Sequence, residues 1–290
     1  MFTADKWTDY RLIDSSDGKR LESWGKYILI RPDPQVIWTD CEASPLWKKA
    51  DASYLRSESG GGHWEKRGNI PESWTIKYES LDLTFTVKPM GFKHTGIFPE
   101  QAANWEWFSK LIKNSGRPIK LLNLFAYTGG ATLAAAKAGA SVTHVDAAKG
   151  MVSQARENAE LSGLEKAPIR WIVDDCRKFV EREIRRGNKY DAIIMDPPSY
   201  GRGPTGEVWK LEDNICEFVR LCADVLSDNP LFVLLNTYTT GLSPSAMGYI
   251  LSMTVGKKFG GKVECGEVGI PVEKSGCILP CGAAARWLSE

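Results

Sequence analysis

The segment Asp196-Pro197-Pro198-Ser199-Tyr200 combines a carboxylate, a rigid backbone and an aromatic ring. It follows the mostly apolar run 190–195, which is typical of a buried strand. The two prolines have no N–H group and a fixed φ, so the carbonyl groups beside Asp196 are held rigidly. Rigid acceptors next to a carboxylate suit a planar group that carries an amine, and Tyr200 can stack on that group. The alternative is a simple strand terminator.

A second candidate site begins at the turn Phe125-Ala126-Tyr127-Thr128-Gly129-Gly130, which joins a buried strand to an alanine-rich helix. Glycine lets the backbone approach a ligand, and the helix N-terminus offers free N–H groups. About 20 residues later, Asp146 ends another strand and is followed by Ala147; a carboxylate there can accept hydrogen bonds from ribose hydroxyls. Together the turn and Asp146 predict a ligand that contains a nucleoside. Each alone also fits a tight turn or a helix N-cap.

The next predicted strand, 169–173, is followed by Asp174-Asp175-Cys176. A side-chain acceptor at this place can bind the exocyclic amine of an adenine. For Asp174 this interpretation and a plain helix cap are equally consistent with the sequence. Cys176 is expected to pack in a helix, although its N–H can face the base.

These residues all follow strands of one α/β pattern. From residue 100, buried strands alternate with amphipathic helices, which predicts a Rossmann-like, doubly wound and mostly parallel sheet. Such sheets bind ligands beyond the carboxyl ends of their strands. Residues 1–99 hold six of the eleven tryptophans and short extended runs, including 35–38, separated by turn signals such as Asp17-Gly18. We therefore predict two domains: a small, Trp-rich, mainly-β domain at 1–99 and an α/β domain at 100–290.

Charge and composition limit the classes of function that the chain can have. Lys+Arg number 37 against 36 Asp+Glu, so the marked basic excess of many nucleic-acid binders is missing, although a local basic patch is compatible with this balance. We expect no signal peptide and no membrane segment. Seven scattered cysteines suggest reduced thiols and a cytoplasmic protein. The three histidines are too dispersed to suggest a metal site. A monomer and a homodimer both remain open.

The chain resembles class I S-adenosylmethionine-dependent methyltransferases. More narrowly, it resembles the branch of bacterial large-subunit ribosomal RNA methyltransferases that act on cytosine C5 or guanine N7. The resemblance covers roughly residues 90–240 and rests on the following segments: 95–101, 124–130, 145–146, 155–164, Asp175 and 196–200. It implies a methyltransferase domain at 100–290, S-adenosylmethionine as the cofactor and RNA, ribosomal RNA above all, as the substrate.

The resemblance also implies roles for single residues. Phe125, Ala126, Tyr127, Thr128 and Gly129 would wrap the methionine part of the cofactor. The ribose would lie at Asp146 and Ala147, the adenine between Asp175 and Cys176, and Gln101 would approach the cofactor from the preceding helix. Asp196 and Pro197 would border the transferred methyl group and, with Tyr200, orient the acceptor.

Three departures from the family pattern bear on the substrate. Glu100-Gln101-Ala102 stands where related enzymes often have Asp-Gln-Arg. C5 methylation needs a cysteine nucleophile, and the segment after the fifth strand, 235–239, has none. The small RNA-binding module often found at the front of the family is not recognisable. An amine or ring nitrogen is therefore favoured over cytosine C5. The alternatives are a small-molecule or protein side-chain methyltransferase, or an inactive nucleic-acid-binding relative.

Two further segments can be read in two ways each. The loop 201–206, between Tyr200 and Lys210 and containing Arg202, is either a lid over the substrate or a plain connection. Lys93 and His94 either line the entrance to the cleft or belong to a solvated loop.

Overall fold

The computed structural model describes residues 1–39, 44–57, 61–91, 93–202, 208–239 and 241–289. Its contacts divide the chain into two compact units. The first, which we call the α/β unit, comprises residues 1–2, 104–268 and 282–290. The second, the β unit, comprises residues 3–103 and 269–281. The β unit thus includes a late segment, at the ends of strands β16 and β17, in addition to the N-terminal residues.

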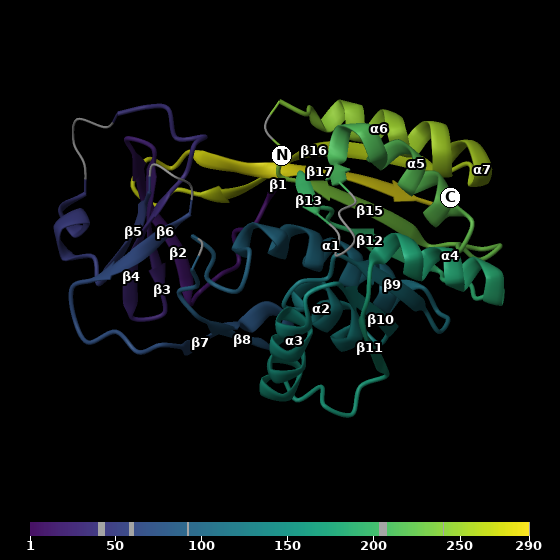
Figure 1. Cartoon of the computed structure of the whole chain (residues 1–290), viewed down its shortest axis with the longest axis horizontal. Helices are drawn as coiled ribbons and strands as arrows, with labels where there is room; N and C mark the ends of the chain where they lie inside the picture. The colour runs from purple at the N-terminus through teal and green to yellow at the C-terminus, as the bar shows by residue number, and fades with distance from the viewer. Residues whose placement is uncertain (40–43, 58–60, 92, 203–207, 240, 290) are drawn as a thin grey trace. The chain divides into compact units, whose positions relative to one another are not determined.

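The α/β unit is built on an eight-stranded sheet with the order β1-β16-β17-β15-β12-β9-β10-β11 (Figure 1). Strands β15, β12, β9, β10 and β11 pair in parallel, whereas β17 runs antiparallel to β15. The bounds are β1 Phe2–Thr3, β9 Lys120–Leu124, β10 Ser141–Asp146, β11 Ile169–Val173, β12 Ala192–Met195, β15 Phe232–Thr237, β16 Lys262–Pro271 and β17 Ile278–Leu288. The chain leaves β9 toward β10 and β11 and returns to its other side at β12, so the strand order switches between β9 and β12. The predicted doubly wound sheet is confirmed.

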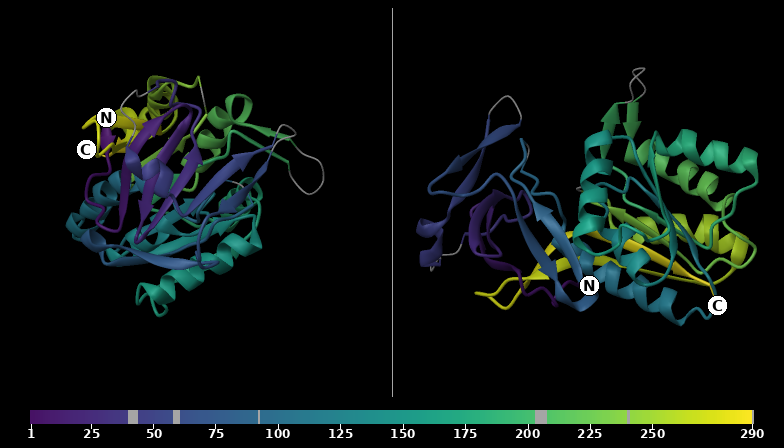
Figure 2. Two further views of the ribbon diagram at one scale, coloured as in Figure 1. Left: turned by 90° about the vertical axis from the view of Figure 1, so that its left-hand side faces the viewer. Right: turned by 90° about the horizontal axis from the view of Figure 1, so that it is seen from below.

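Helices cover both faces of this sheet because its strands are apolar on both sides (Figures 1 and 2). Leu122 and Leu124 of β9 belong to the core that α4, α5 and α6 complete. On the opposite face, Phe232 of β15 stacks against Phe108 of α1, and Asn123 bonds to Thr132 of α2. The bounds are α1 Ala102–Asn114, α2 Gly130–Lys137, α3 Lys149–Leu161, α4 Cys176–Arg186, α5 Leu211–Ala223, α6 Pro244–Leu251, a π-helical turn Ser252–Gly256 and α7 Lys257–Phe259.

The β unit contains a five-stranded sheet and a separate two-stranded one. The larger sheet has the order β2-β3-β4-β5-β6 and is antiparallel except between β4 and β5. The bounds are β2 Tyr10–Ser16, β3 Lys19–Trp24, β4 Tyr27–Pro32, β5 Ala52–Arg56, β6 Gly62–Lys66, β7 Trp74–Tyr78 and β8 Leu83–Val87, with 3-10 turns at Pro45–Lys49, Glu79–Leu81 and Pro99–Gln101. The predicted mainly-β character of this region is confirmed.

One expected extended run of the β unit is not a strand. Residues 35–38 instead bind the hairpin turn between β2 and β3. The N–H groups of Asp17 and Gly18 donate to the carbonyls of Trp38 and Val36. Val36 is buried while Ile37 is exposed. The largely apolar run resembles a strand in the sequence, but its backbone hydrogen bonds go to a turn rather than to a neighbouring strand.

The core of the β unit contains a network of buried ions. Glu22 accepts hydrogen bonds from Arg31 at 2.6 and 2.7 Å and from the Tyr10 hydroxyl at 2.8 Å. Arg20 lies 3.6 Å from Glu22 and forms an ion pair with Asp33 at 2.7 Å. Burial opposes ionisation of Glu22, but the two guanidinium groups and the Tyr10 hydroxyl hold its pKa below the usual value. Each charge therefore has a partner of opposite sign.

Candidate functional site

The turn after β9 is held in a strained conformation. Phe125 and Tyr127 both have positive φ, 57° and 51°, which is costly for residues with large side chains, on the order of 1–3 kcal/mol each. The backbone N–H groups of both strained residues have partners. Phe125 donates to the Cys176 sulfur at 3.3 Å, and Tyr127 donates to the Asp146 carboxylate at 2.8 Å. The turn is therefore fixed from β10 and α4. Strain of this kind gathers where backbone meets a ligand.

Two glycines close this turn for reasons that are steric. Gly129 has φ 89° and precedes the first residue of α2, and a Cβ there would lie 3.0 Å from the Cβ of Ala155. At Gly130 a Cβ would lie 2.6 Å from the ring of Trp105. The turn thus packs directly on α1 and α3, and a larger residue would displace it.

Asp146, at the end of β10, lies beside this turn. Its two carboxylate oxygens accept from the backbone N–H groups of Tyr127 and Ala148, each at 2.8 Å. Burial raises the pKa of Asp146, and the two N–H groups only partly oppose that rise. A half-buried carboxylate oxygen has a further lone pair, which a ligand hydroxyl can use. The predicted ribose contact therefore has a suitable acceptor in place, and Ala147 next to it is exposed.

The residues after β11 have structural partners. Asp174 accepts from the N–H of Asp175 and forms an ion pair with Arg182. Asp175 is the N-cap of α4 and accepts from the N–H of Lys178 at 2.9 Å. Cys176 is buried, and burial raises the pKa of its thiol well above the usual value. Asp175 and Cys176 stay predicted contacts of the adenine. One of the two carboxylate oxygens of Asp175 is already used by the helix cap.

Asp196 follows β12, the strand that pairs with β9. Its N–H lies 3.4 Å from the carbonyl of Leu124, and Met195 pairs with Leu124, so Asp196 is level with Phe125, the first residue of the turn on the neighbouring strand. Pro197 is buried, whereas Pro198 and Ser199 are exposed and Tyr200 is 51% exposed. The sheet thus brings Asp196, Asp146 and the turn at 125–129 to one edge. Their individual roles remain predictions.

Side chains from two other elements bind this corner. Trp209, on β14 (Val208–Lys210), donates from its indole N–H to the Pro198 carbonyl at 2.7 Å. The Thr239 hydroxyl, beyond β15, donates to the Ser199 hydroxyl at 2.7 Å. Strand β14 pairs with β13 (Tyr200–Arg202) as a hairpin. Residues 203–206 of the predicted lid lie outside the described residues.

Three residues named from the sequence belong to the β unit. Gln101 ends the 3-10 turn Pro99–Gln101 and is buried, and its predicted approach to the cofactor remains a prediction. Lys93 is half-buried, which lowers the pKa of its ammonium beside Arg20 and Arg31. Burial, together with Arg31 and Lys93, lowers the pKa of His94 to about 4. Neither is a freely solvated loop residue.

Sequence reasoning overlooked two residues that stabilise the site. Asn158 is buried on α3 and donates to the carbonyl of Thr128 at 3.0 Å, within the turn at 125–129. Its position among Ala155 and Ala159, on the apolar stripe of the helix, was an available signal, because a buried amide needs a partner. Trp209 gave no such signal, since its partner at Pro198 depends on the hairpin.

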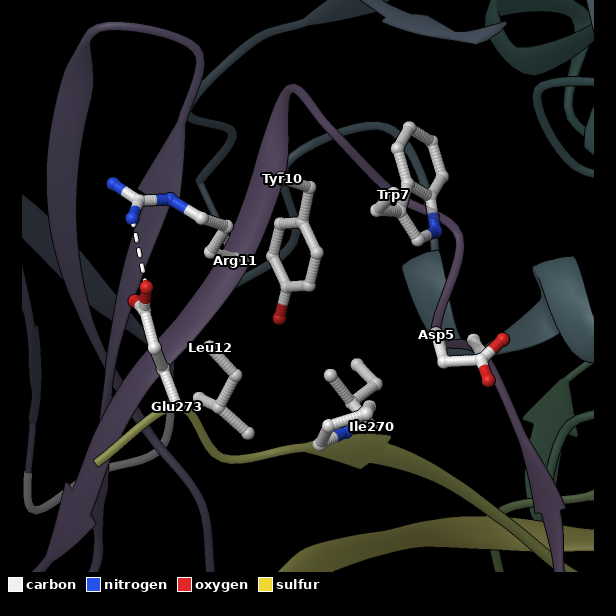
Figure 3. A pocket seen from close by; sticks show the side chains of 9 residues that line it. Asp5, Trp7, Tyr10, Arg11, Leu12, Ile270 and Glu273 are labelled. Carbon is white, nitrogen blue, oxygen red and sulfur yellow. Dashed lines mark hydrogen bonds and ion pairs between the residues drawn. The ribbon is translucent and has the colours of Figure 1, made fainter. Parts of the chain in front are cut away.

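A separate pocket of about 190 Å³ lies in the β unit (Figure 3). Trp7, Tyr10, Leu12 and Ile270 line it, with the ion pair of Arg11 and Glu273 at 2.9 Å on its rim. The polar groups here bind within the protein: Trp7 donates to the Pro99 carbonyl, and Tyr10 to Glu22. The pocket is therefore a gap between elements whose hydrogen bonds are already made.

Within the described ranges, no three residues among His, Cys, Asp and Glu are grouped as metal ligands would be. No helix there is both long and apolar enough to cross a bilayer.

Comparisons with known proteins agree with the fold. A crystal structure of a SAM-dependent methyltransferase from Agrobacterium tumefaciens has a TM-score of 0.92 and 38% identity, and the match covers 100% of this chain and 93% of that one. Ribosomal RNA large subunit methyltransferase I of Aeromonas salmonicida is 36% identical over 178 residues, or 59% of this chain and 42% of the relative. Ribosomal RNA large subunit methyltransferase K/L of Shewanella frigidimarina is 30% identical over 160 residues, or 54% and 22%.

The matched part spans less than half the length of these two curated relatives. A family model described as S-adenosylmethionine-dependent methyltransferase matches residues 52–237, a stretch that includes the ends of β9, β10, β11 and β12. The fold, the strand-end residues and this match together show that the chain belongs to the S-adenosylmethionine-dependent methyltransferase family.

Proposed function

We propose that this protein transfers a methyl group from S-adenosylmethionine to a nucleobase in RNA, with ribosomal RNA as the first candidate. The observation that carries the proposal is the adjacency of two strand ends. Asp196 leaves β12 directly beside the end of β9, where the strained turn begins. The similarity to methyltransferases named for large-subunit ribosomal RNA supports RNA as the substrate class.

The residues at this edge fit the cofactor. Asp146 offers a desolvated carboxylate to the ribose hydroxyls, and the turn at 125–129 leads into the N-terminus of α2. When bound, the cofactor supplies a methyl group already activated by a positive sulfur. The task left to this chain is to hold the acceptor in line with that methyl group.

Asp196 and Pro197 are suited to hold an acceptor nitrogen. The Asp196 carboxylate can accept an N–H of the base and take the proton that the nitrogen sheds after methylation. The Pro198 carbonyl already binds Trp209, so the Pro197 carbonyl is the proline acceptor left for the substrate. The exposed ring of Tyr200 offers a stacking surface next to this pair.

A nitrogen acceptor also agrees with the cysteines. Addition to cytosine C5 needs a thiolate. Residues 235–239, which span the end of β15 and the two residues after it, read Leu-Asn-Thr-Tyr-Thr. Cys176 lies at the strand-end edge, but burial raises the pKa of its thiol and the sulfur accepts the N–H of Phe125. A buried neutral thiol is a poor nucleophile. We therefore propose an exocyclic amine or ring nitrogen as the methyl acceptor.

The test is methylation of ribosomal RNA from cells that lack this gene, using S-adenosylmethionine with a labelled methyl group. Nucleoside mass spectrometry should find one N-methylated base, which is absent from RNA of the deleted cells and present in the parent. Asp196→Ala is the control for labelling by contaminants. Label in 5-methylcytidine would contradict the nitrogen acceptor. Label in protein or a small molecule, with none in RNA, would contradict the RNA substrate.

A further inference from the structure

The segment 196–199, which we call the acceptor corner, has few backbone N–H groups that could hold it in place. Pro197 and Pro198 have no N–H groups, so this stretch cannot be fixed through its own backbone donors. Pro198 and Ser199 are also exposed, so packing in the core does not hold them in place. The corner is nevertheless held by bonds from outside it. The Leu211 N–H donates to the Ser199 carbonyl at 3.0 Å, and two side chains provide the others.

Trp209 is the larger of these side chains. While its N–H donates to the Pro198 carbonyl at 2.7 Å, its ring contacts Phe125 and Phe218 at centroid distances of 5.8 and 5.7 Å. Phe125 has positive φ and is the first residue of the turn at 125–129, which we call the cofactor turn because of its proposed role. One indole therefore touches the acceptor corner at its nitrogen and the cofactor turn at its ring.

Thr239 holds the same corner from the side of β15. Its hydroxyl donates to the Ser199 hydroxyl at 2.7 Å. Pro198 and Ser199 are thus each tied to a different element, the β13–β14 hairpin and the end of β15. Neither Trp209 nor Thr239 is needed for the sheet itself, because the parallel ladder is complete without them.

We propose that Trp209 and Thr239 are positioning residues for methyl transfer, which set the distance between the acceptor corner and the cofactor turn. This inference rests on the proposed function but concerns residues that need not touch the substrate. Displacement of a reacting group by about 1 Å costs on the order of 100-fold in rate, so a loosened corner should lower turnover strongly. The cofactor should still bind, because its turn keeps the bonds to Asp146, Cys176 and Asn158.

The test compares two tryptophans. Trp209→Phe keeps a ring against Phe125 and Phe218 but removes the N–H donor. Trp287→Phe is the matched control, because its indole also donates to a carbonyl at 2.7 Å, that of Gly260 beyond α7. We expect W209F to lower kcat about tenfold, the equivalent of one hydrogen bond, with the cofactor Kd within about twofold. W287F should lower Tm and leave kcat unchanged.

Hydrogen exchange of the peptide 196–202, without RNA, gives a readout that does not depend on the acceptor. It should become faster in W209F and stay unchanged in W287F. Thr239→Val, a nearly isosteric change at a half-buried residue outside the core, should lower kcat less than W209F and also spare cofactor binding.

Wild-type kcat in both W209F and T239V would overturn the inference, as would equal losses in W209F and W287F. If W209F does not fold, wild-type kcat in T239V alone overturns it. If the wild-type protein labels no RNA, the proposed function fails, and the exchange comparison decides: unchanged exchange in W209F overturns the inference, and faster exchange there alone supports it.

Discussion

Buried carboxylates serve different ends in the two units of this protein. In the β unit, Glu22 is completely buried and is surrounded by Arg31, Arg20 and the Tyr10 hydroxyl, which hold its pKa below the usual value. In the α/β unit, Asp146 is half-buried, accepts hydrogen bonds from two backbone N–H groups, and has a raised pKa. The first carboxylate is neutralised inside the fold. The second is desolvated and is bound by backbone N–H groups rather than by a guanidinium, which suits it to receive donors from a ligand.

The difference shows what to look for in a site. A fully paired ion network stabilises one arrangement of the chain and leaves little for a substrate to gain. A strand-end carboxylate beside a strained turn has unused hydrogen-bonding capacity. The free-energy cost of removing water from it already arises when the chain folds, so it does not oppose ligand binding. Polar burial by itself therefore does not mark function; the kind of partner does.

The largest effect is expected from breaking the network of the β unit. Glu22→Ala leaves Arg31 and Arg20 buried without their carboxylate and should lower the free energy of unfolding by about 3–5 kcal/mol. Urea denaturation measures this loss. The matched control is Glu79→Ala, whose ion pair with Lys77 at 3.2 Å is exposed and should contribute far less to stability. Equal losses in the two variants would show that the buried network is not a stabilising unit.

Acid should weaken the α/β unit through His144. This histidine is completely buried, its Nδ1 lies 2.9 Å from the Thr132 hydroxyl, and burial lowers its pKa from 6.5 to about 3. Below pH 6.5 the unfolded chain binds a proton that the folded chain does not. Stability should therefore fall by about 3 kcal/mol between pH 6.5 and 4.

Unfolding curves across that pH range measure the slope, and His144→Gln should flatten it. His94, in the β unit, has a pKa of about 4 and is less buried, so His94→Gln should flatten the slope less. If H94Q has the larger effect, the acid-sensitive histidine lies in the β unit instead.

At the strand-end edge, Asp196→Ala should lower kcat about 100-fold, because the acceptor loses the group that orients it. The cofactor Kd should change less than about threefold, since Asp196 acts on the acceptor. Isothermal calorimetry and single-turnover rates separate these effects. Asp196→Asn keeps an acceptor oxygen and removes the base, so near-normal rates there would assign positioning rather than proton transfer. A loss of affinity larger than the loss of rate would exchange the proposed roles of Asp196 and Asp146.

The smallest of these effects is expected for Asp146→Ala, about a tenfold weaker cofactor affinity, equivalent to the loss of one charge-assisted hydrogen bond. Calorimetry with S-adenosylmethionine measures it directly. Asp146→Asn retains one oxygen for the N–H of Tyr127 or Ala148 and should lie between wild type and alanine. Unchanged affinity in the alanine variant would contradict the ribose assignment. The contrast between Glu22 as a structural carboxylate and Asp146 as a binding carboxylate would then fail.

Much of the α/β unit could be predicted, because its signals are local. The run 120–124 and the glycine-containing turn after it predict a strand and a helix start, and Asp146 and Asp196 each end an apolar run. The β unit was harder to resolve. Residues 35–38 have the apolar composition of a strand, but the carbonyls of Val36 and Trp38 pair with a turn at Asp17 and Gly18. The segment 269–281 joins the β unit from the far end of the sequence.

The amino-acid sequence by itself determined which residues come at the ends of which strands, because side-chain period, glycine and proline act over a few neighbours. Only the tertiary structure decided which strand ends are adjacent and what holds them. The bonds from Asn158 to Thr128, Trp209 to Pro198 and Thr239 to Ser199 join residues 11 to 40 positions apart. Such bonds leave little trace in local pattern, since each donor is specified by the place to which the fold carries it.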